Sequence, residues 1–282
     1  MPTNRKNGYV EIKPHWQSKH KILGKYLNAC LQFQQKYNNF AYIDSHGGSG
    51  KVLLDGKQVD GSPLIAAKQL KNFPCHITEI DEGSYKRLLE SCKGISNIYP
   101  QNGDCNVLVP RIISSIESWK FCLCFVDPDG LVYHKGGQKY MQLTHETVDH
   151  IANSVKSNGP KTELLLNFQA ISILRTMGYV EKLPDDDKTP IMEEDINALY
   201  GCDDWKSAKN RRGLLDLFID KRLSSFGYKG SYLVEDNGHP LYYLLYASHS
   251  DVGAKIMKDI MGREYGQLLL QEDPIERFYF DN

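Results

Sequence analysis

The sequence predicts an α/β fold built on a mostly parallel sheet with helices on both faces. Short apolar stretches typical of buried strands alternate five times with stretches of helical periodicity, which is the pattern of a parallel sheet. Acidic residues stand at or just beyond the ends of the first four of these strands, and open α/β sheets bind ligands at that edge. The 282 residues suffice for one large α/β core with an insertion.

The predicted elements follow one another from residue 15 to residue 177. Strands are assigned from short apolar runs and helices from apolar residues at helical spacing. Ser62-Pro63 supplies the N-cap and first-turn residues of one helix, and Asp55-Gly56 is a hairpin turn. In order, we predict a helix over 15–37, a strand over 40–44, a hairpin over 51–60, a helix over 62–72, a strand over 75–80, a helix to residue 92, a strand over 96–99, a helix over 107–119, a strand over 121–126, a helix from Thr144 to Lys156, a strand over 162–168 and a helix to about residue 177.

The alternation breaks at residue 181. A polar loop and two helices, over 191–200 and 203–224, form a predicted insertion beside the sheet. Two strand-like runs then flank Asn237-Gly238, a strong hairpin signal, and a helix over 252–261 follows. The predicted organisation is a basic N-terminal segment and helix (1–39), a Rossmann-like cofactor-binding core (40–180), a helical insertion (181–229), and a C-terminal hairpin and helix that complete the core (230–282).

Composition predicts a soluble, cytoplasmic protein with no membrane association. No apolar run approaches the roughly 20 residues that cross a bilayer, and the polar first 13 residues lack the core of a secretory signal. Seven scattered cysteines without a CxxC pair indicate a reducing compartment and neither disulfides nor a zinc site. The run from His145 to His150 is one residue too long for HExxH, so its histidines lie on different helix faces. We therefore expect no metal site.

Basic residues gather at the start of the chain. Residues 1–36 contain seven Lys or Arg against the single acid Glu11. Such a patch suits contacts with nucleic-acid phosphates, but on a solvated helix basic residues are more often simply part of the surface. Nucleic acid is therefore one candidate partner.

The stretch Asp44 to Gly50, Asp-Ser-His-Gly-Gly-Ser-Gly, is the strongest candidate for a ligand site. An acid at a strand end followed by glycines lets the backbone approach a ligand, because glycine has no Cβ. A triphosphate-binding P-loop requires glycine where Ser45 stands and Ser or Thr where Val52 stands. A dinucleotide is disfavoured because Asp44 places negative charge where the pyrophosphate would lie. The pattern favours a cofactor with a cationic amino group, such as S-adenosylmethionine.

The predicted cofactor-binding residues come from three successive strand ends. Glu79 is expected to accept hydrogen bonds from ribose hydroxyls, and Asp104 to meet an adenine amino group. The remaining predicted cofactor contacts belong to the first strand end and its loop, namely Asp44, His46, Gly48, Ser49 and Gly50.

Two motifs resemble those of class I S-adenosylmethionine-dependent methyltransferases. Residues 42–50, Tyr-Ile-Asp-Ser-His-Gly-Gly-Ser-Gly, resemble the D-x-F-A-G-x-G first motif, and residues 125–130, Phe-Val-Asp-Pro-Asp-Gly, resemble the F-x-D-P-F-G form of the fourth motif, related to D-P-P-Y. From about residue 19 to 261 the chain more closely resembles the three-Cys-motif partner family (TcmP). The segments that carry this resemblance are Lys19-His20, 61–66, 165–168 and 241–248.

This resemblance implies a Rossmann-like class I methyltransferase fold, with a seven-stranded sheet whose last hairpin supplies the antiparallel strand. It also implies S-adenosylmethionine as cofactor and a partner protein that carries three cysteines. Asp127 and Pro128 would then meet the methyl acceptor, and Asn167 would line its pocket. The chain departs from the family motifs at Ser45-His46-Gly47, and at Asp129, which replaces an aromatic residue that stacks on a flipped base.

Two functions of different classes follow from the sequence. The first is an S-adenosylmethionine-dependent methyltransferase that acts on a nucleic acid or nucleotide-like acceptor, in which the protein mainly positions the reactants. The alternative is a non-catalytic, methyltransferase-like binding subunit that works with the three-cysteine partner in phage defence or DNA modification. Fold similarity does not decide between them.

Overall fold

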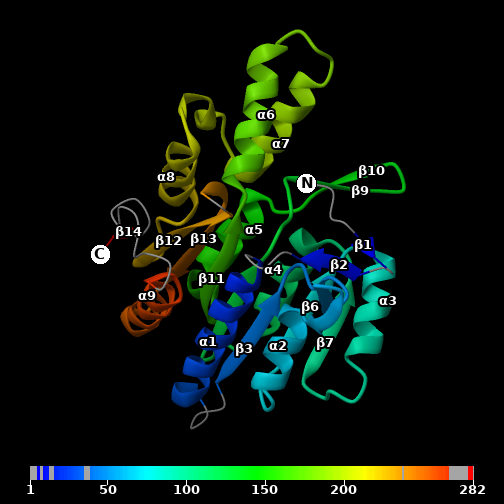
Figure 1. The fold of residues 1–282 in the computed structure, drawn as a ribbon. Helices are drawn as coiled ribbons and strands as arrows, with labels where there is room; N and C mark the ends of the chain where they lie inside the picture. Colours follow the sequence, from blue (N-terminus) through cyan, green and yellow to red (C-terminus); the bar gives the residue numbers. More distant parts are fainter. Residues whose placement is uncertain are drawn as a thin grey trace.

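A computed structural model describes residues 5–6, 9–12, 16–34, 39–236, 238–266 and 279–281. Its core is a single large sheet with helices on both faces (Figure 1). The strands of this sheet are β3 (Phe40–Asp44), β6 (Cys75–Glu79), β7 (Ile98–Asn102), β8 (Phe121–Val126), β11 (Lys161–Phe168), β12 (Tyr228–Asp236), β13 (His239–Ser248) and β14 (Tyr279–Asp281). They lie side by side in the order β14-β12-β13-β11-β8-β3-β6-β7.

The strand directions confirm the mostly parallel sheet with an antiparallel C-terminal hairpin. Strands β7, β6, β3, β8 and β11 are parallel neighbours, whereas β13 runs antiparallel to both β11 and β12. These are the seven predicted strands, and the short β14 adds an eighth beside β12. The chain moves from β3 outward to β7 and then returns to β8 on the other side of β3, which makes the β3–β8 boundary the topological switch point where such sheets bind ligands.

Two apolar clusters bury the two faces of the sheet. Helices α1 (Trp16–Gln34), α2 (Ser62–Gln69), α3 (Glu82–Ser91) and α9 (Asp251–Gly266) contribute to one cluster. Helices α4 (Cys105–Ser115), α5 (His145–Ala152), α6 (Ala170–Lys182), α7 (Thr189–Tyr200) and α8 (Arg211–Arg222) contribute to the other. Apolar side chains from both surfaces of each central strand are therefore buried, as the near-continuous apolar runs of parallel strands require.

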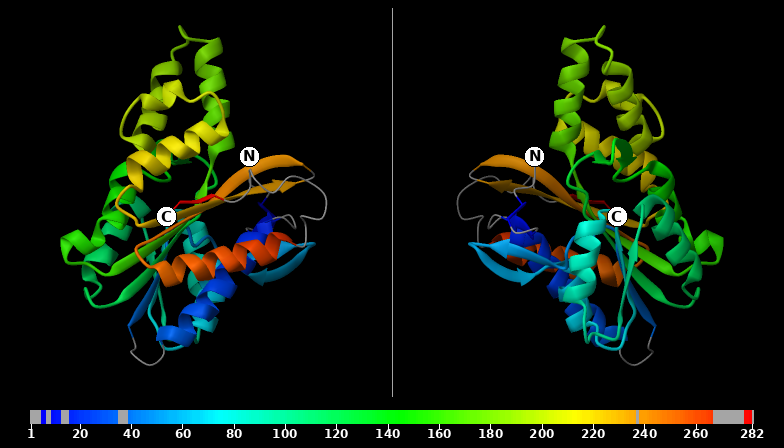
Figure 2. Two further views of the ribbon diagram at one scale, coloured as in Figure 1. Left: turned by 90° about the vertical axis from the view of Figure 1, so that its left-hand side faces the viewer. Right: turned by 90° about the vertical axis from the view of Figure 1, so that its right-hand side faces the viewer.

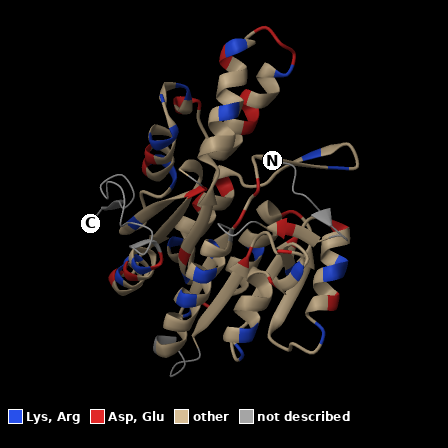
Figure 3. Ribbon diagram, in the orientation of Figure 1, with Lys and Arg blue, Asp and Glu red and all other residues tan. Residues whose placement is uncertain are grey.

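Helices α6, α7 and α8 rise beyond the carboxyl edge of the parallel strands (Figures 1 and 2). This part of the chain joins the core through Leu214 and Phe218 of α8 and through Trp205 of the 3₁₀ turn (Asp204–Ser207) before α8, all of which are buried. The turn between α6 and α7 carries Asp185 to Asp187, which appear as red at the tip in Figure 3. This tip is therefore locally acidic, which disfavours its contact with a polyanion.

Several element boundaries differ from the predictions for local reasons. The third strand is β7 and begins at Ile98 rather than 96, and α4 begins two residues earlier than predicted because Asp104 caps it. Gly61, not Ser62, is the N-cap of α2. The helix predicted to reach residue 156 ends at Ala152, and a 3₁₀ turn follows. The predicted turn at Asn237-Gly238 lies partly outside the described residues.

Two small sheets surround the carboxyl edge of the main sheet. The predicted hairpin over 51–60 is β4 (Lys51–Leu54) and β5 (Lys57–Asp60), and it joins β1 (Arg5–Lys6) and β2 (Tyr9–Ile12) in the order β1-β2-β4-β5. An unpredicted hairpin consists of β9 (Val132–Lys135) and β10 (Gln138–Met141) and projects from the sheet edge (Figure 1). Its strands lack the alternation of apolar and polar residues that identifies a half-buried strand.

No helix among the described residues is long and apolar enough to cross a membrane. All seven cysteines are free thiols. Cys122 and Cys124 are fully buried in β8, where they pack as small apolar side chains.

Candidate functional site

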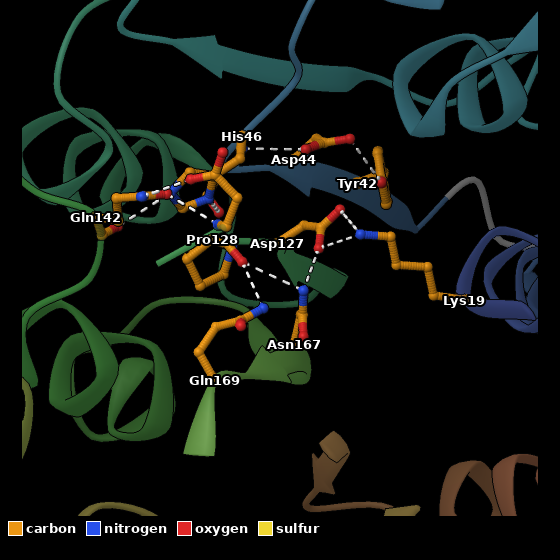
Figure 4. A network of polar contacts seen from close by, with 11 residues as sticks. Lys19, Tyr42, Asp44, His46, Asp127, Pro128, Gln142, Asn167 and Gln169 are labelled. Atoms are coloured by element: carbon orange, nitrogen blue, oxygen red, sulfur yellow. Dashed lines mark hydrogen bonds and ion pairs between the residues drawn. The ribbon is translucent and has the colours of Figure 1, made fainter. Parts of the chain in front are cut away.

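The candidate site lies at the switch point, where the carboxyl ends of β3 and β8 adjoin. Register pairs Asp44 with Phe125, so Asp44 and Asp127 follow neighbouring strand ends. Figure 4 shows the polar network that surrounds them, drawn from the loop after β3, the loop after β8, the end of β11 and helix α1. The structure thus brings together predicted residues that are more than 80 positions apart in sequence.

The glycine loop after β3 depends on three glycines for different reasons. Gly48 and Gly50 have φ angles of 57° and 75°, in the left-handed region that favours glycine. A Cβ on Gly47 would lie only 2.2 Å from Cγ2 of Ile77. A Cβ on Gly48 would meet nothing within 4 Å, so the loop backbone there borders open space where a ligand can approach it.

Replacing Gly47 with Ala is expected to destabilise the protein by about 1–3 kcal/mol, because the new methyl group overlaps Ile77 and forces the loop away from β6. Gly262→Ala is the matched control. Gly262 lies in α9 with open space around it, and alanine there is expected to stabilise the helix by about 0.5–1 kcal/mol. Urea unfolding measures both changes. A neutral Gly47→Ala would show that the loop is not packed as described.

Asp44 is a fully buried carboxyl group. It accepts hydrogen bonds from the Tyr42 hydroxyl and the His46 backbone N–H, both at 3.1 Å, and from the Ser62 side chain. Burial raises the pKa of Asp44 from 3.8 to about 7, although these three hydrogen bonds oppose the shift. Since all three donors are neutral, a cationic ligand would stabilise the charged form of Asp44.

His46 links the glycine loop to the segment after the β9–β10 hairpin. Its Nε2 lies 3.0 Å from the carbonyl oxygen of Gln142, and its Nδ1 lies 2.6 Å from Oγ of Ser45. A carbonyl only accepts, so Nε2 carries the proton and Nδ1 accepts from Ser45. Burial lowers the pKa of His46, which keeps the ring neutral. Both ring nitrogens therefore bond within the protein, and His46 fixes the loop in place of the aromatic residue of the family motif.

Glu79 fixes the glycine loop from the end of β6. Its two carboxylate oxygens accept hydrogen bonds from the backbone N–H groups of Gly48 and Asp81, each at 2.7 Å. These two bonds tie the glycine loop and the N-cap residue of α3 to the end of β6, and the contact of Glu79 with ribose hydroxyls stays a prediction. Of the remaining predicted contacts, the Ser49 hydroxyl bonds the Lys51 carbonyl at 2.7 Å, which turns it toward its own loop.

Asp104 is the N-cap of α4. Its Oδ1 accepts hydrogen bonds from the backbone and side-chain nitrogens of Asn106, at 2.8 and 3.0 Å. This placement gives Asp104 a structural role at the end of β7, as expected for a residue of this type before a helix. Its contact with an adenine amino group stays a prediction.

Asp127 forms the centre of the network. The Nζ of Lys19 lies 2.6 Å from each carboxylate oxygen, and Nδ2 of Asn167 donates to Oδ1 at 2.8 Å. Burial alone raises the pKa of Asp127, but the Lys19 ammonium and the hydrogen bonds from Lys19 and Asn167 outweigh it, so the pKa lies below 3.8. Asp127 is therefore a charged hydrogen-bond acceptor, suited to orienting a donor rather than to removing a proton at neutral pH.

The Pro128 carbonyl is also occupied. It accepts from Nδ2 of Asn167 at 3.2 Å and from Nε2 of Gln169 at 3.1 Å. Asn167 and Gln169 thus hold the loop after β8 from the end of β11. The Asp127 carboxylate lies at the same strand end and faces Lys19 (Figure 4).

Two important residues were not assigned from the sequence. Lys19 was as compatible with a surface position as with a site, but only 4% of it is exposed. Gln142 was not singled out. Its side chain bonds both the backbone N–H and the carboxylate of Asp129, at 3.0 and 2.6 Å, while its carbonyl accepts from His46. Gln142 thereby joins both loops, and it holds Asp129, which stands where the motif that residues 125–130 resemble has an aromatic residue. Neither residue has a local sequence signal, because each contact spans a long separation.

The unpredicted hairpin is anchored beside the Glu79 loop. The Tyr133 hydroxyl donates to Oδ2 of Asp81 at 3.0 Å, and Nζ of Lys135 donates to the Ile80 carbonyl at 2.8 Å. On its other strand, Lys139 forms an ion pair with Asp195 of α7 at 2.5 Å. The hairpin therefore spans from the end of β6 to the raised helices, across the carboxyl edge that carries the candidate site.

No protein-family model matches the chain, and no curated protein matches it. Among solved structures, protein LPL1258 from Legionella pneumophila, of the family model DUF519, has a TM-score of 0.52 at 12% identity, over 92% of this chain and 94% of that one. This similarity shows the fold alone. A SAM-dependent methyltransferase from Agrobacterium tumefaciens has a TM-score of 0.46 at 10% identity, over 86% of this chain and 64% of that one. The N-terminal domain of human METTL16 in complex with SAH has a TM-score of 0.42 at 12% identity, over 84% and 70%.

The chain therefore has a Rossmann-like α/β fold, with a mostly parallel sheet that ends in an antiparallel hairpin. The glycine loop and the neighbouring acids occupy its switch point. Membership of the TcmP family stays a prediction.

Proposed function

We propose that this protein is an S-adenosylmethionine-dependent methyltransferase that acts on a nucleic acid or nucleotide-like acceptor. The observation that carries the proposal is the meeting of Asp44, Glu79 and Asp127 around a glycine loop at the switch point of the sheet. Gly48 borders open space there, which suits close contact with a bulky cofactor. The acids suit a cofactor that is cationic at its amino and sulfonium groups and neutral at its ribose.

The site residues Asp44, Glu79 and Asp127 each have a definable role in this activity. The cofactor, when bound, supplies an electrophilic methyl group. Asp44 attracts the amino group of that ligand, and Glu79 binds the ribose hydroxyls while it holds Gly48. Asp127 accepts a hydrogen bond from the nucleophile and so fixes its direction of attack, for which Lys19 must give up part of its contact. Transfer by in-line displacement needs this positioning more than it needs proton abstraction.

Calorimetry with S-adenosylmethionine and S-adenosylhomocysteine tests the cofactor assignment. Glu79→Ala is expected to weaken both ligands at least about tenfold, because charge-assisted hydrogen bonds to the ribose hydroxyls are lost. Glu90→Ala, an exposed glutamate on α3 that pairs with Lys93, is the matched control and should bind like the unaltered protein. An absence of heat with both ligands in the unaltered protein would sink the proposal.

A second candidate function is a methyltransferase-like binding subunit that recognises a three-cysteine partner protein. The observation that favours it is the engagement of both Asp127 oxygens by Lys19 and of the Pro128 carbonyl by two amides, because these groups would meet a methyl acceptor. Cofactor binding without transfer of labelled methyl groups to DNA, RNA or the partner would favour this function over the first.

A further inference from the structure

Two buried polar atoms beside Asp127 have no hydrogen-bond partner. Among the described residues, six buried side-chain atoms lack one: Asn39 Oδ1, Gln69 Oε1, Arg87 Nε, Asn167 Oδ1, Arg222 Nε and Tyr242 Oη. Asn167 bonds Asp127 directly, and Tyr242 lies over Lys19, with Nζ of Lys19 5.9 Å from its ring centroid. Buried polar groups are nearly always paired in native proteins, so an unpaired one indicates a missing ligand or water.

The sheet register places these two residues on one face of the sheet. In β13, Leu244 pairs with Asn167 and Tyr243 pairs with Phe168. Tyr242 and Leu244 point to the same face because side chains alternate along a strand, and directly opposed residues share a face. Tyr242 and Asn167 therefore lie on the face that α1 covers, at the edge where Lys19 meets Asp127.

Tyr242 is the residue of the two that can serve a ligand at Asp127. The Asn167 amide directs its Nδ2 toward Asp127, so its Oδ1 faces the other way. Burial, and then the charge of Asp127, raise the pKa of Tyr242, whose hydroxyl therefore stays protonated and can donate. Only 5% of Tyr242 is exposed, so its hydroxyl gains little from solvent.

We propose that Tyr242 is an acceptor-binding residue and that the acceptor is an aminated nitrogen heterocycle. The Tyr242 hydroxyl would donate to a ring nitrogen, while Asp127 accepts an N–H from the amino group on the adjacent carbon. On their Watson–Crick edges adenine and cytosine present this pair of an acceptor nitrogen beside an amino group, whereas uracil presents a ring N–H between carbonyl oxygens and has no amino group. A hydroxyl acceptor would have to satisfy both protein groups through a single oxygen atom, whereas an aminated heterocycle offers each group an atom of its own. The proposal rests on the proposed function and specifies its substrate class.

Thermal unfolding without ligand tests whether the hydroxyl is unpaired. Tyr242→Phe is expected to raise the melting temperature by about 2–4 °C, because it removes a buried polar group that nothing satisfies. Tyr246→Phe is the matched control on the same strand. The Tyr246 hydroxyl lies 2.6 Å from that of Tyr26 in a buried cluster with Glu163, so its loss should lower the melting temperature. A fall for Tyr242→Phe would overturn the proposal, because the hydroxyl would then be bonded within the protein.

Nucleotide binding in the presence of S-adenosylhomocysteine tests the substrate class. Adenosine and cytidine monophosphates are the probes, and uridine monophosphate is their control. At least one aminated nucleotide should bind the unaltered protein at least about fivefold more tightly than uridine monophosphate. Tyr242→Phe should lose that preference, whereas Tyr246→Phe should keep it. Equal binding of all three nucleotides, or of none, would overturn the proposal.

The two arms separate this proposal from the function on which it rests. If the protein does not bind S-adenosylhomocysteine, the proposed function is contradicted. Nucleotide binding measured without that ligand then still tests the role of Tyr242. If the protein binds S-adenosylhomocysteine but Tyr242→Phe keeps the preference for aminated nucleotides, the proposed function stands and the role assigned to Tyr242 is contradicted. Unchanged S-adenosylhomocysteine affinity in Tyr242→Phe is the further expected result, since Tyr242 is assigned to the acceptor.

Discussion

Lys19→Met is expected to destabilise the protein by about 3–5 kcal/mol, because it leaves the buried carboxylate of Asp127 without its counter-ion. The Lys19 and Asp127 side chains are only 6% and 13% exposed, so water compensates little for the lost charge. Methionine keeps most of the apolar stem, which limits the contribution of lost packing. Urea unfolding at neutral pH measures the effect.

Two further variants separate the lost charge from other causes. Lys19→Met combined with Asp127→Asn removes both charges and is expected to recover much of the stability that the single variant loses. Lys25→Met, in the same helix, removes an exposed lysine that pairs with Glu264, and it should change stability by about 0.5 kcal/mol or less. A Lys19→Met protein as stable as Lys25→Met, or a double variant as weak as the single one, would contradict the description of a buried ion pair.

Stability is expected to fall between about pH 4 and pH 7 through Asp44, and Asp44→Asn should remove that fall. The folded-state pKa of about 7 lies above the ordinary value of 3.8. In this interval the native protein holds a proton that the unfolded chain has released, so rising pH favours unfolding. The full shift corresponds to a loss of stability on the order of 4 kcal/mol, which is absent below pH 4 and complete above pH 7.

The measurement compares urea unfolding of the unaltered protein and Asp44→Asn at pH 5 and pH 8. The variant is expected to be more stable by on the order of 1–2 kcal/mol at pH 5 and by on the order of 4 kcal/mol at pH 8, because asparagine stays neutral throughout. The difference between the two proteins isolates Asp44 from other titrating groups. A constant difference across this range would refute the raised pKa.

Under the proposed function, the titration of Asp44 should also make cofactor affinity depend on pH. Only charged Asp44 attracts the amino group of S-adenosylmethionine, so affinity should rise by about tenfold from pH 6 to pH 8, as the charged fraction does around a pKa near 7. Asp44→Asn should bind weakly and without this dependence.

The sequence reveals the frame of the site because strand ends have local signals. Asp44, Glu79 and Asp127 each close a short apolar run, and parallel strands bring such ends to one edge. The fold class and the order of most elements follow from the same periodicity. The predicted positions of Asp44 and Asp127 at strand ends agree with the structure, which in addition makes the two strands neighbours.

The contacts that set the chemistry of the site have no such signal. Lys19 lies 108 positions from Asp127, and His46 lies 96 from Gln142, so periodicity within a segment says nothing of either pair. Asp104 does have a local signal, but that signal has two meanings, because an acid between a strand and a helix is explained equally well as a ligand contact and as a helix cap. The β9–β10 hairpin was missed because its residues do not alternate between apolar and polar, and because its two strands pair with each other rather than with the main sheet.

The distance along the chain between Lys19 and Asp127 also has a consequence for synthesis. During translation, α1 is complete well before the strand that ends at Asp127 has been made. Helix α1 also pairs with α9 through Lys25 and Glu264, and α9 is made later still. Domains fold as units once their interacting parts are available. The pair at the centre of this site can therefore form only after Asp127 has been made, and a nascent chain arrested before β8 carries Lys19 without its partner.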